Sequence, residues 1–270
     1  MYGADSVELA EALTNIGNSL VVIHDFPGAI AALTRARALC EAKLGPNDRH
    51  VAYAMSELGV VAERQGRLDD ALALIRQAET IEVAAVGPEH PDAADYLERE
   101  ASVLTSQGKL ADTEPLLTRA IAIYRAAYGN EHPRVAVGLS ALAQHQGRLD
   151  HYKDALATWQ DALKIFEHTL PADHPNVSYA LAGIGDALTE LGRPTEALPY
   201  LDRALAIRLG RHMPPELVAE IHFYFAAALV AAPATRARAL EEARTALALY
   251  KQAGDADDVH ELTVWLAKHA

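Results

Sequence analysis

A segment of about 42 residues repeats through most of the chain, and it constrains the fold more than any other feature. In the second half of each repeat, alanine recurs every 42 residues without a gap, at Ala36, Ala78, Ala120, Ala162, Ala204 and Ala246. Seven positions earlier stand Ala29, Ala71, Thr113, Ala155, Ala197 and Ala239, and between the two series lie Leu33, Ile75, Leu117, Trp159, Leu201 and Ala243. Spacings of three, four and seven residues place these positions on one face of a helix. Alanine there predicts helices that approach each other closely.

The first half of each repeat carries a second apolar stripe, which in the first repeat reads Leu13, Ile16, Gly17 and Leu20. A small residue recurs within it, at Gly17, Gly59, Ala101, Ala143, Gly185 and Ala226. Glycine inside a helix costs about 0.5–1 kcal/mol relative to alanine, so we expect close packing to offset this cost. Glu100 and Gln146 interrupt the stripe, which predicts looser packing there or a partner for each polar group.

Glycine and proline divide each repeat into two helices. Gly66, Gly108 and Gly192 stand between the halves, where a left-handed residue ends a helix, and His24 and Asp150 take the same place in other repeats. Glycine or proline also marks the linkers between repeats, as in residues 44–46, 86–91, 128–133 and 170–175. Each repeat is therefore predicted to be a helical hairpin that stacks on its neighbours in an all-α solenoid.

Six hairpins are expected, at residues 4–44, 45–86, 87–128, 129–170, 171–211 and 212–253 of a single domain that spans 1–270. Val259, Leu262, Trp265 and Leu266 have helical spacing and predict a C-terminal capping helix at 256–269. Residues 2–10 align in phase with the linker at 44–52. This alignment suggests the hypothesis that the chain is a piece of a longer protein or has lost preceding repeats.

Composition narrows the class of protein. The formal net charge of −13 argues against a general nucleic-acid binder, which would present a basic face to the phosphates. The single cysteine, Cys40, excludes an internal disulfide and fits a reducing compartment. The first residues have neither the basic end nor the apolar run of a signal peptide, and the apolar stretch at 223–232 is half of a membrane span. We therefore expect a cytoplasmic protein that binds neither nucleic acid nor membranes.

The glycine, the turn and the paired alanines of each repeat resemble the tetratricopeptide repeat (TPR), whose usual length is about 34 residues. The longer repeat and the linkers Gly87-Pro88-Glu89-His90-Pro91 and Tyr128-Gly129-Asn130-Glu131-His132-Pro133 are similar to those of kinesin light chains. The resemblance covers nearly the whole chain and implies a right-handed α-solenoid. Residues 215–220 and 237–240 also resemble repeats that follow bacterial serine/threonine kinase domains. The chain has no glycine-rich loop, His-Arg-Asp or Asp-Phe-Gly motif of a kinase.

We find no catalytic constellation, and we expect neither an enzyme nor a cofactor nor a metal site. His90, His132 and His174 are one repeat apart, too far to share a metal ion, so each is predicted to cap the helix that follows it. Cys40 has no neighbour that would activate a thiol. Gly183-Ile184-Gly185 resembles half of a dinucleotide fingerprint, but both glycines fall on positions that the repeat keeps small.

The remaining candidate is the concave groove that the first helices of the hairpins are expected to line. Polar and aromatic residues beside the packing stripe are predicted to bind a partner there: Thr14, Asn15, Asn18, Tyr53, Glu57, Glu98, Arg99, Ser102, Gln144, Tyr179, Asp186 and Tyr224. Amides and arginine hydrogen-bond a peptide backbone, and tyrosine gives flat apolar contact. The sequence therefore predicts a non-enzymatic module that binds a basic or neutral protein segment. The alternatives are a structural or oligomerisation spacer, or the non-catalytic C-terminal region of a kinase.

Overall fold

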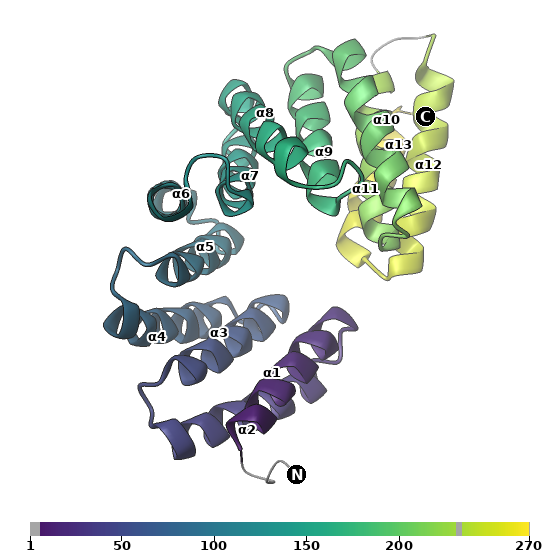
Figure 1. Ribbon diagram of the computed structural model, residues 1–270. Helices are drawn as coiled ribbons and strands as arrows, with labels where there is room; N and C mark the ends of the chain where they lie inside the picture. Colours follow the sequence, from purple (N-terminus) through teal and green to yellow (C-terminus); the bar gives the residue numbers. More distant parts are fainter. Residues whose placement is uncertain (1–5, 231–233, 270) are drawn as a thin grey trace. The chain divides into compact units, whose positions relative to one another are not determined.

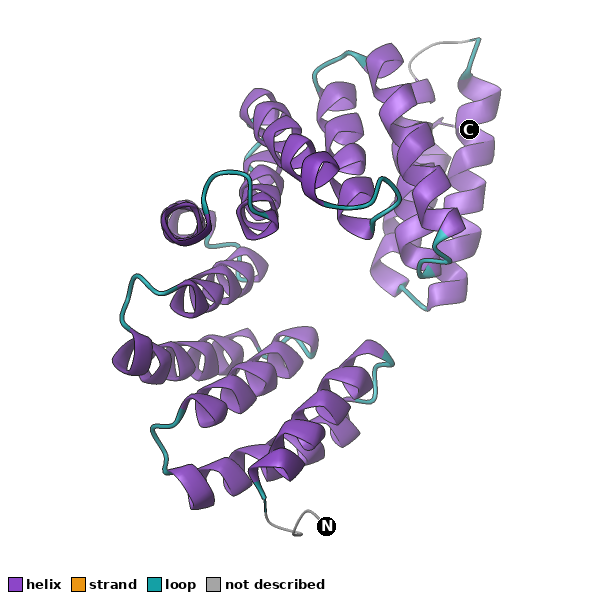
Figure 2. Ribbon diagram, in the orientation of Figure 1, coloured by secondary structure: helices purple, strands orange, loops and turns teal. Residues whose placement is uncertain are grey.

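The computed structural model describes residues 6–230 and 234–269, and Figures 1 and 2 show these residues as helices joined by short loops. The helices are α1 (Val7–Val22), α2 (Phe26–Leu44), α3 (Arg49–Arg64), α4 (Leu68–Val86), α5 (Pro91–Ser106), α6 (Leu110–Tyr128), α7 (Pro133–Arg148), α8 (Tyr152–Thr169), α9 (Pro175–Glu190), α10 (Pro194–Gly210), α11 (Pro215–Val230), α12 (Arg236–Ala253) and α13 (Ala256–His269). No strand occurs in the part of the chain that the structure describes. The predicted all-α fold of repeated helical hairpins is confirmed.

The chain divides into two compact units, which we call the N-terminal unit (Met1–Asn130, α1–α6) and the C-terminal unit (Glu131–Ala270, α7–α13). In the N-terminal unit the first helices of the hairpins, α1, α3 and α5, contact one another in sequence, and in the C-terminal unit α7, α9 and α11 do the same. Each second helix packs on the first helix of its own hairpin and, within a unit, on that of the next. The first helices therefore form one layer in each unit.

The last helix, α13, packs against α12 as the first helix of a further hairpin would. Its Leu262 is buried, and Val259, Trp265 and Leu266 pack around the same core cluster. The predicted capping helix is confirmed. At the other end, residues 1–5 of the predicted opening linker lie outside the described residues, and Ser6 caps α1 by accepting a hydrogen bond from the Leu9 N–H at 3.2 Å.

The small positions of the repeat hold the two helices of a hairpin in close contact. A Cβ atom added at Gly17 would lie 2.6 Å from Leu33 Cγ, and one at Gly185 would lie 2.4 Å from Leu201 Cδ2. The alanines that recur every 42 residues are fully buried. The close packing expected from the sequence is therefore present. It explains why glycine, which weakens isolated helices, occurs inside the first helices of these hairpins.

Two positions of the apolar stripe on the first helices show that burial depends on the neighbouring helices and side chains. Ile16, expected on the packing stripe, is 51% exposed, whereas the corresponding Ile184 is fully buried. The expectation for Ile16 was wrong because α9 packs between two second helices, α8 and α10, whereas α1 packs on only one, α2. Glu100 is buried and pairs with Arg76, with Oε1 and Nη2 2.6 Å apart. The expected partner is thus found for Glu100, whereas Gln146 Oε1 is buried without a hydrogen bond to a described residue.

Turn and cap residues adopt the predicted conformations. Gly66, Gly108 and Gly192 have φ values of +73°, +73° and +72°, and His24 and Asp150, at the same place in their repeats, have +60° and +59°. Each histidine of the linkers caps the next helix: Nδ1 of His90, His132 and His174 accepts a hydrogen bond from the N–H of Asp92, Arg134 and Asn176 at 3.2, 3.2 and 3.1 Å. The predicted capping role of these histidines is confirmed.

Candidate functional site

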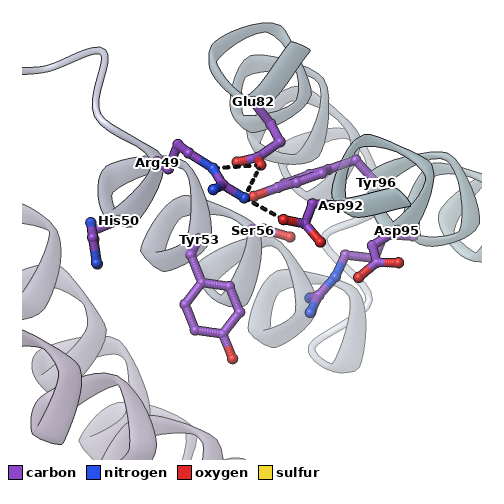
Figure 3. Close-up of a pocket in the computed structure, with 9 residues that line it drawn as sticks. Arg49, His50, Tyr53, Ser56, Glu82, Asp92, Asp95 and Tyr96 are labelled. Carbon is purple, nitrogen blue, oxygen red and sulfur yellow. Dashed lines mark hydrogen bonds and ion pairs between the residues drawn. The ribbon is translucent and has the colours of Figure 1, made fainter. Parts of the chain in front are cut away.

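The N-terminal unit has a pocket of about 370 Å³ between α3, α4 and α5 (Figure 3). It is lined by Arg49, His50, Tyr53, Ser56, Glu82, Asp92, Asp95, Tyr96 and Arg99. Ser56 is fully buried, and its hydroxyl oxygen makes no hydrogen bond to any described residue. Tyr53 is 45% exposed and offers its ring to a partner.

An ion-pair network closes one side of this pocket. Figure 3 shows the Arg49 guanidinium between the carboxylates of Glu82 and Asp92. Arg49 Nη2 lies 2.6 Å from Glu82 Oε1, and the same nitrogen contacts Asp92. The Glu82 side chain is almost fully buried, so this pair fixes α3 against α4 and α5. Its charges are satisfied within the chain.

A second ion pair joins the same repeat position in two successive hairpins. Arg99 Nη2 donates to Glu57 Oε1 at 2.7 Å, and the two residues are 42 positions apart. Beside them the Tyr124 hydroxyl lies 2.6 Å from Asp95 Oδ1 and 3.1 Å from Glu98 Oε2. Burial raises the pKa of Glu98 to about 7, although the Tyr124 hydrogen bond and the Arg99 charge oppose the shift. The predicted residues on α5 are thus engaged with the protein itself.

The other predicted residues of the N-terminal unit are spread along its first helices. Thr14 is buried and donates to the Ala10 carbonyl at 2.9 Å, so its hydroxyl is bonded within α1 and not available to a partner. The Asn18 amide donates to the Tyr53 hydroxyl at 3.4 Å, Ser102 donates to Glu63 at 2.8 Å, and Asn15 is exposed. Of the eight predicted residues in this unit, only Tyr53 and Arg99 line the pocket.

The C-terminal unit has a pocket of about 410 Å³ on the layer formed by α7, α9 and α11. All four residues predicted in this unit, Gln144, Tyr179, Asp186 and Tyr224, line it. Sequence reasoning did not select the other residues that line it: Ala143, Gly147, Arg148, Tyr152, Ala155, Trp159, Ala182, Gly183, Ala187, Glu190, Arg208 and Glu220. Because the repeat places equivalent positions on the same face of successive first helices, the four predicted side chains from three helices line one cavity.

A buried arginine organises one wall of this pocket. The Arg208 side chain is fully buried, and its Nη1 donates to Glu220 Oε2 at 2.6 Å and to the Leu217 carbonyl. The Arg208 guanidinium carbon lies 5.1 Å from the centre of the Tyr179 ring, a cation–π contact. Tyr224 donates to the other oxygen of Glu220 at 3.1 Å. These contacts tie α9, α10 and α11 together.

Asp186, like the exposed Arg148 and Glu190, makes no hydrogen bond or ion pair with any described residue, but it alone of these three is partly buried. Burial, followed by the charges of Glu190 and Glu220, raises the pKa of Asp186 to about 7. A carboxylate is held there although the protein offers it no compensating cation, and this cost is typical of functional positions.

Trp159 and Gly183 form the apolar wall, and both depart from the pattern of the repeat. Trp159 takes a position where Leu33, Ile75 and Leu201 stand elsewhere, and a Cβ atom at Gly183 would lie 2.2 Å from Trp159 Cε2. The large side chain on α8 therefore fits because α9 has glycine opposite it. The sequence analysis assigned the tryptophan to the packing stripe and Gly183 to a small position of the repeat. The second assignment was wrong, because the equivalent positions hold Asn15, Glu57 and Arg99.

Other kinds of site find no support among the described residues. No group of three or more His, Cys, Asp or Glu residues is placed to hold a metal ion within residues 6–230 and 234–269. Cys40 is buried, and burial, with the charges of Asp48 and Glu11, raises the pKa of its thiol. None of the described helices combines the length and the apolar character that a membrane crossing requires.

Comparison with known proteins gives a consistent result. The family model described as tetratricopeptide repeat matches residues 8–82, 92–168 and 148–209, well over half of the chain. No curated protein sequence matches this chain significantly.

Several solved structures share the fold at low sequence identity. TPR-like repeats assigned to a kinesin light chain of Podosopora anserina are 18% identical, with 77% of this chain and 98% of that chain covered and a TM-score of 0.61. BtubC (BKLC) from P. vanneervenii is 18% identical, with 90% and 88% covered and a TM-score of 0.62. A Rap protein complexed with competence and sporulation factor is 16% identical, with 97% and 88% covered and a TM-score of 0.60.

Proposed function

We propose a binding function for this chain, which belongs to the tetratricopeptide repeat family. The chain acts as a non-enzymatic interaction module in the cytoplasm, as a scaffold or regulatory part. It binds a protein or peptide segment on the layer of first helices rather than on the second helices. It needs no cofactor.

One observation carries the proposal. Gln144, Tyr179, Asp186 and Tyr224 lie on three successive first helices, and they line one cavity of about 410 Å³. A cavity of this size, with aromatic walls and a few polar groups, has the composition of a ligand site. The N-terminal unit supports the same role with the exposed Tyr53 at its own pocket.

Charge indicates the kind of partner. The chain has a formal net charge of −13, and Asp186 keeps an unpaired carboxylate at the pocket. A basic or neutral segment therefore meets a favourable potential, whereas a nucleic acid or an anionic membrane surface meets repulsion. Screening extends over about 8–10 Å at ordinary salt, so affinity for a basic segment should fall as salt rises.

The structural neighbours are compatible with this role. One of them was solved as a complex, that of the Rap protein with competence and sporulation factor, at a TM-score of 0.60. An all-helical repeat with this fold can therefore carry a bound partner. The partner of the present chain is to be found by experiment.

The test is a selection followed by a measurement. Peptides that bind the immobilised chain are selected from a randomised display library, and their affinity is measured by calorimetry against two sets of variants. The groove variants are Asn15→Ala/Asn18→Ala/Arg99→Ala and Gln144→Ala/Tyr179→Ala, and the control is Gln77→Ala/Gln160→Ala, at exposed positions of second helices.

We expect at least one groove variant to weaken the selected peptides by about tenfold, because contact residues at the centre of an interface commonly contribute 1–2 kcal/mol. The control should leave the affinity unchanged. Equal binding by all variants would show that the layer of first helices is not the binding surface. A stable oligomer in light scattering that the groove variants abolish would favour the spacer role instead.

A further inference from the structure

The C-terminal pocket holds one partly buried carboxylate, that of Asp186, without a partner among the described residues. Among its three acidic side chains, Glu220 is paired with Arg208 and accepts a hydrogen bond from Tyr224. Glu190 is exposed on the last turn of α9. Asp186 lines the same pocket without a hydrogen bond or ion pair to the described residues. A carboxylate in such a place is stabilised by any cation that enters.

The cations of the protein do not fill this role. Arg208 lines the pocket with a fully buried side chain, whose Nη1 donates to Glu220 and the Leu217 carbonyl and whose guanidinium lies over the Tyr179 ring. Its Nε and Nη2 are buried without a hydrogen bond to a described residue, and neither forms an ion pair with Asp186. Arg148 is exposed at the end of α7 and forms no ion pair with a described residue. Burial and the charges of Glu190 and Glu220 raise the pKa of Asp186, so its ionised form is disfavoured until a cation enters the pocket.

The walls next to Asp186 suit a cation. Gly183 and Asp186 are three residues apart on α9 and so share one face, and the Trp159 indole lies against Gly183. Tyr179 and Tyr224 add two more aromatic side chains to the lining. Indole and phenol rings attract a guanidinium or ammonium group placed over their faces, by about 0.5–2 kcal/mol. A carboxylate among aromatic rings is thus matched to an organic cation rather than to a metal ion or an anion.

We propose that the C-terminal pocket binds a single cationic side chain, a guanidinium or an ammonium, of the partner segment, with Asp186 as its counter-ion and Trp159 as its apolar wall. The inference rests on the proposed binding function and names the partner chemistry at this site. The bound cation replaces the missing partner of Asp186, and the aliphatic stem of the side chain contacts the small residues Ala182 and Gly183.

The probes are N-acetyl-arginine amide and its neutral isostere N-acetyl-citrulline amide, titrated into the full chain and followed by amide chemical shifts. We expect saturable binding of the arginine probe and about tenfold weaker binding of the citrulline probe, since one charge-assisted contact is lost. Asp186→Asn should weaken the arginine probe by the same factor, whereas Asp161→Asn, an exposed change on α8, should not. Trp159→Leu, which restores the residue usual in the repeat, should weaken it about threefold.

The pH dependence of the affinity for the arginine probe is a second test, because a residue with a merely structural role would not change it. Affinity for the arginine probe should rise from pH 6 to pH 8, because Asp186 becomes ionised over this range and the probe stays charged. The titratable groups that line the pocket with it are Glu190 on α9, Glu220 and Tyr224 on α11, Arg148 on α7, Tyr152 on α8 and Arg208 on α10. Asp186→Asn should abolish the rise.

Two outcomes separate this inference from the proposed function. Equal binding of both probes, or arginine binding that Asp186→Asn leaves intact, would overturn the cation site. If selected peptides still depended on Asn15, Asn18 and Arg99, the binding function would stand without it. If no peptide is selected yet the arginine probe binds through Asp186, the pocket is a cation site and the segment-binding function is wrong. Circular dichroism of each variant checks that it is folded.

Discussion

The two pockets are built on the same repeat, and they treat one repeat position in opposite ways. In the N-terminal unit this position holds Glu57 and Arg99, which pair with each other across neighbouring first helices. In the C-terminal unit it holds Gly183, whose missing side chain leaves room for the Trp159 indole. The first arrangement satisfies its charges within the protein. The second opens an aromatic cavity beside the unpaired Asp186, and it is the one suited to a ligand.

The difference lies in a few side chains and not in the fold of the hairpins. The helix-contact alanines and glycines are kept in both units, so the hairpins pack alike. Two residues of opposite size, a tryptophan on a second helix where Leu33, Ile75 and Leu201 are buried in other repeats and a glycine on the next first helix, alter one helix contact.

Arg208→Met should destabilise the C-terminal unit by about 3 kcal/mol, because removing one partner of a buried pair leaves Glu220 and the Leu217 carbonyl without their donor. Both tryptophans, Trp159 and Trp265, lie in this unit, so urea unfolding followed by tryptophan fluorescence reports on it. The control Arg193→Met removes an exposed pair with Glu196 and should cost less than about 1 kcal/mol. Equal losses for both changes would show that Arg208 does not organise the wall.

Gly183→Ala should cost about 1–3 kcal/mol, because its Cβ would overlap the Trp159 indole. The cost should nearly disappear when Trp159→Leu is introduced first, since leucine leaves the space free. The four proteins form a double-mutant cycle, and their unfolding free energies give the coupling directly. Additive effects would mean that the tryptophan and the glycine are unrelated, and the contrast between the two pockets would lose its basis.

Asp186→Asn should stabilise the C-terminal unit by about 1 kcal/mol at pH 8 and have no effect near pH 4. The pKa of Asp186 is raised from 3.8 to about 7, so the folded state resists ionisation. The contribution of this carboxyl to stability is complete below pH 4, is lost as the pH rises toward 7, and stays lost above. Urea midpoints of both proteins at several pH values provide the measurement. A constant difference between them would contradict the assigned shift.

His90→Ala and His174→Ala should each cost about 1 kcal/mol, because each histidine accepts a hydrogen bond from the backbone at a helix N-terminus. Here the two units are expected to behave alike, since the cap belongs to the shared repeat. Thermal unfolding followed by circular dichroism measures both. His168→Ala, at an exposed position within α8, serves as the control and should leave the midpoint unchanged. A loss in only one unit would show that the linkers have diverged.

Glu57 and Arg99 should couple by about 1 kcal/mol or less in a cycle of Glu57→Gln and Arg99→Gln, because the arginine remains partly open to solvent. The coupling should shrink at high salt, through screening. Zero coupling at low salt would show that Glu57 does not stabilise Arg99 at the wall of the N-terminal pocket.

Much of the fold could be predicted from particular residues. Alanine every 42 positions identified the helix contacts, and glycine or proline identified the turns and linkers. The linker histidines were predicted as caps and are caps, because capping depends on residues two apart. Ile16 was predicted wrongly, since its burial depends on a neighbouring second helix that α1 lacks. The residues of the candidate site were only partly foreseen: Gln144, Tyr179, Asp186 and Tyr224 share one pocket, whereas Thr14 serves its own helix.

The sequence by itself determined the all-α repeat, the hairpin boundaries and the stripe of small residues, because these depend on local periodicity and on backbone conformation at single positions. Only the tertiary structure decided which charges are paired and which are open. Glu57 meets Arg99 across 42 residues, Arg208 is buried against Glu220 and Tyr179, and Asp186 receives no partner. Such differences depend on side chains that approach from separate helices, and the repeat places the helices without fixing which side chains meet.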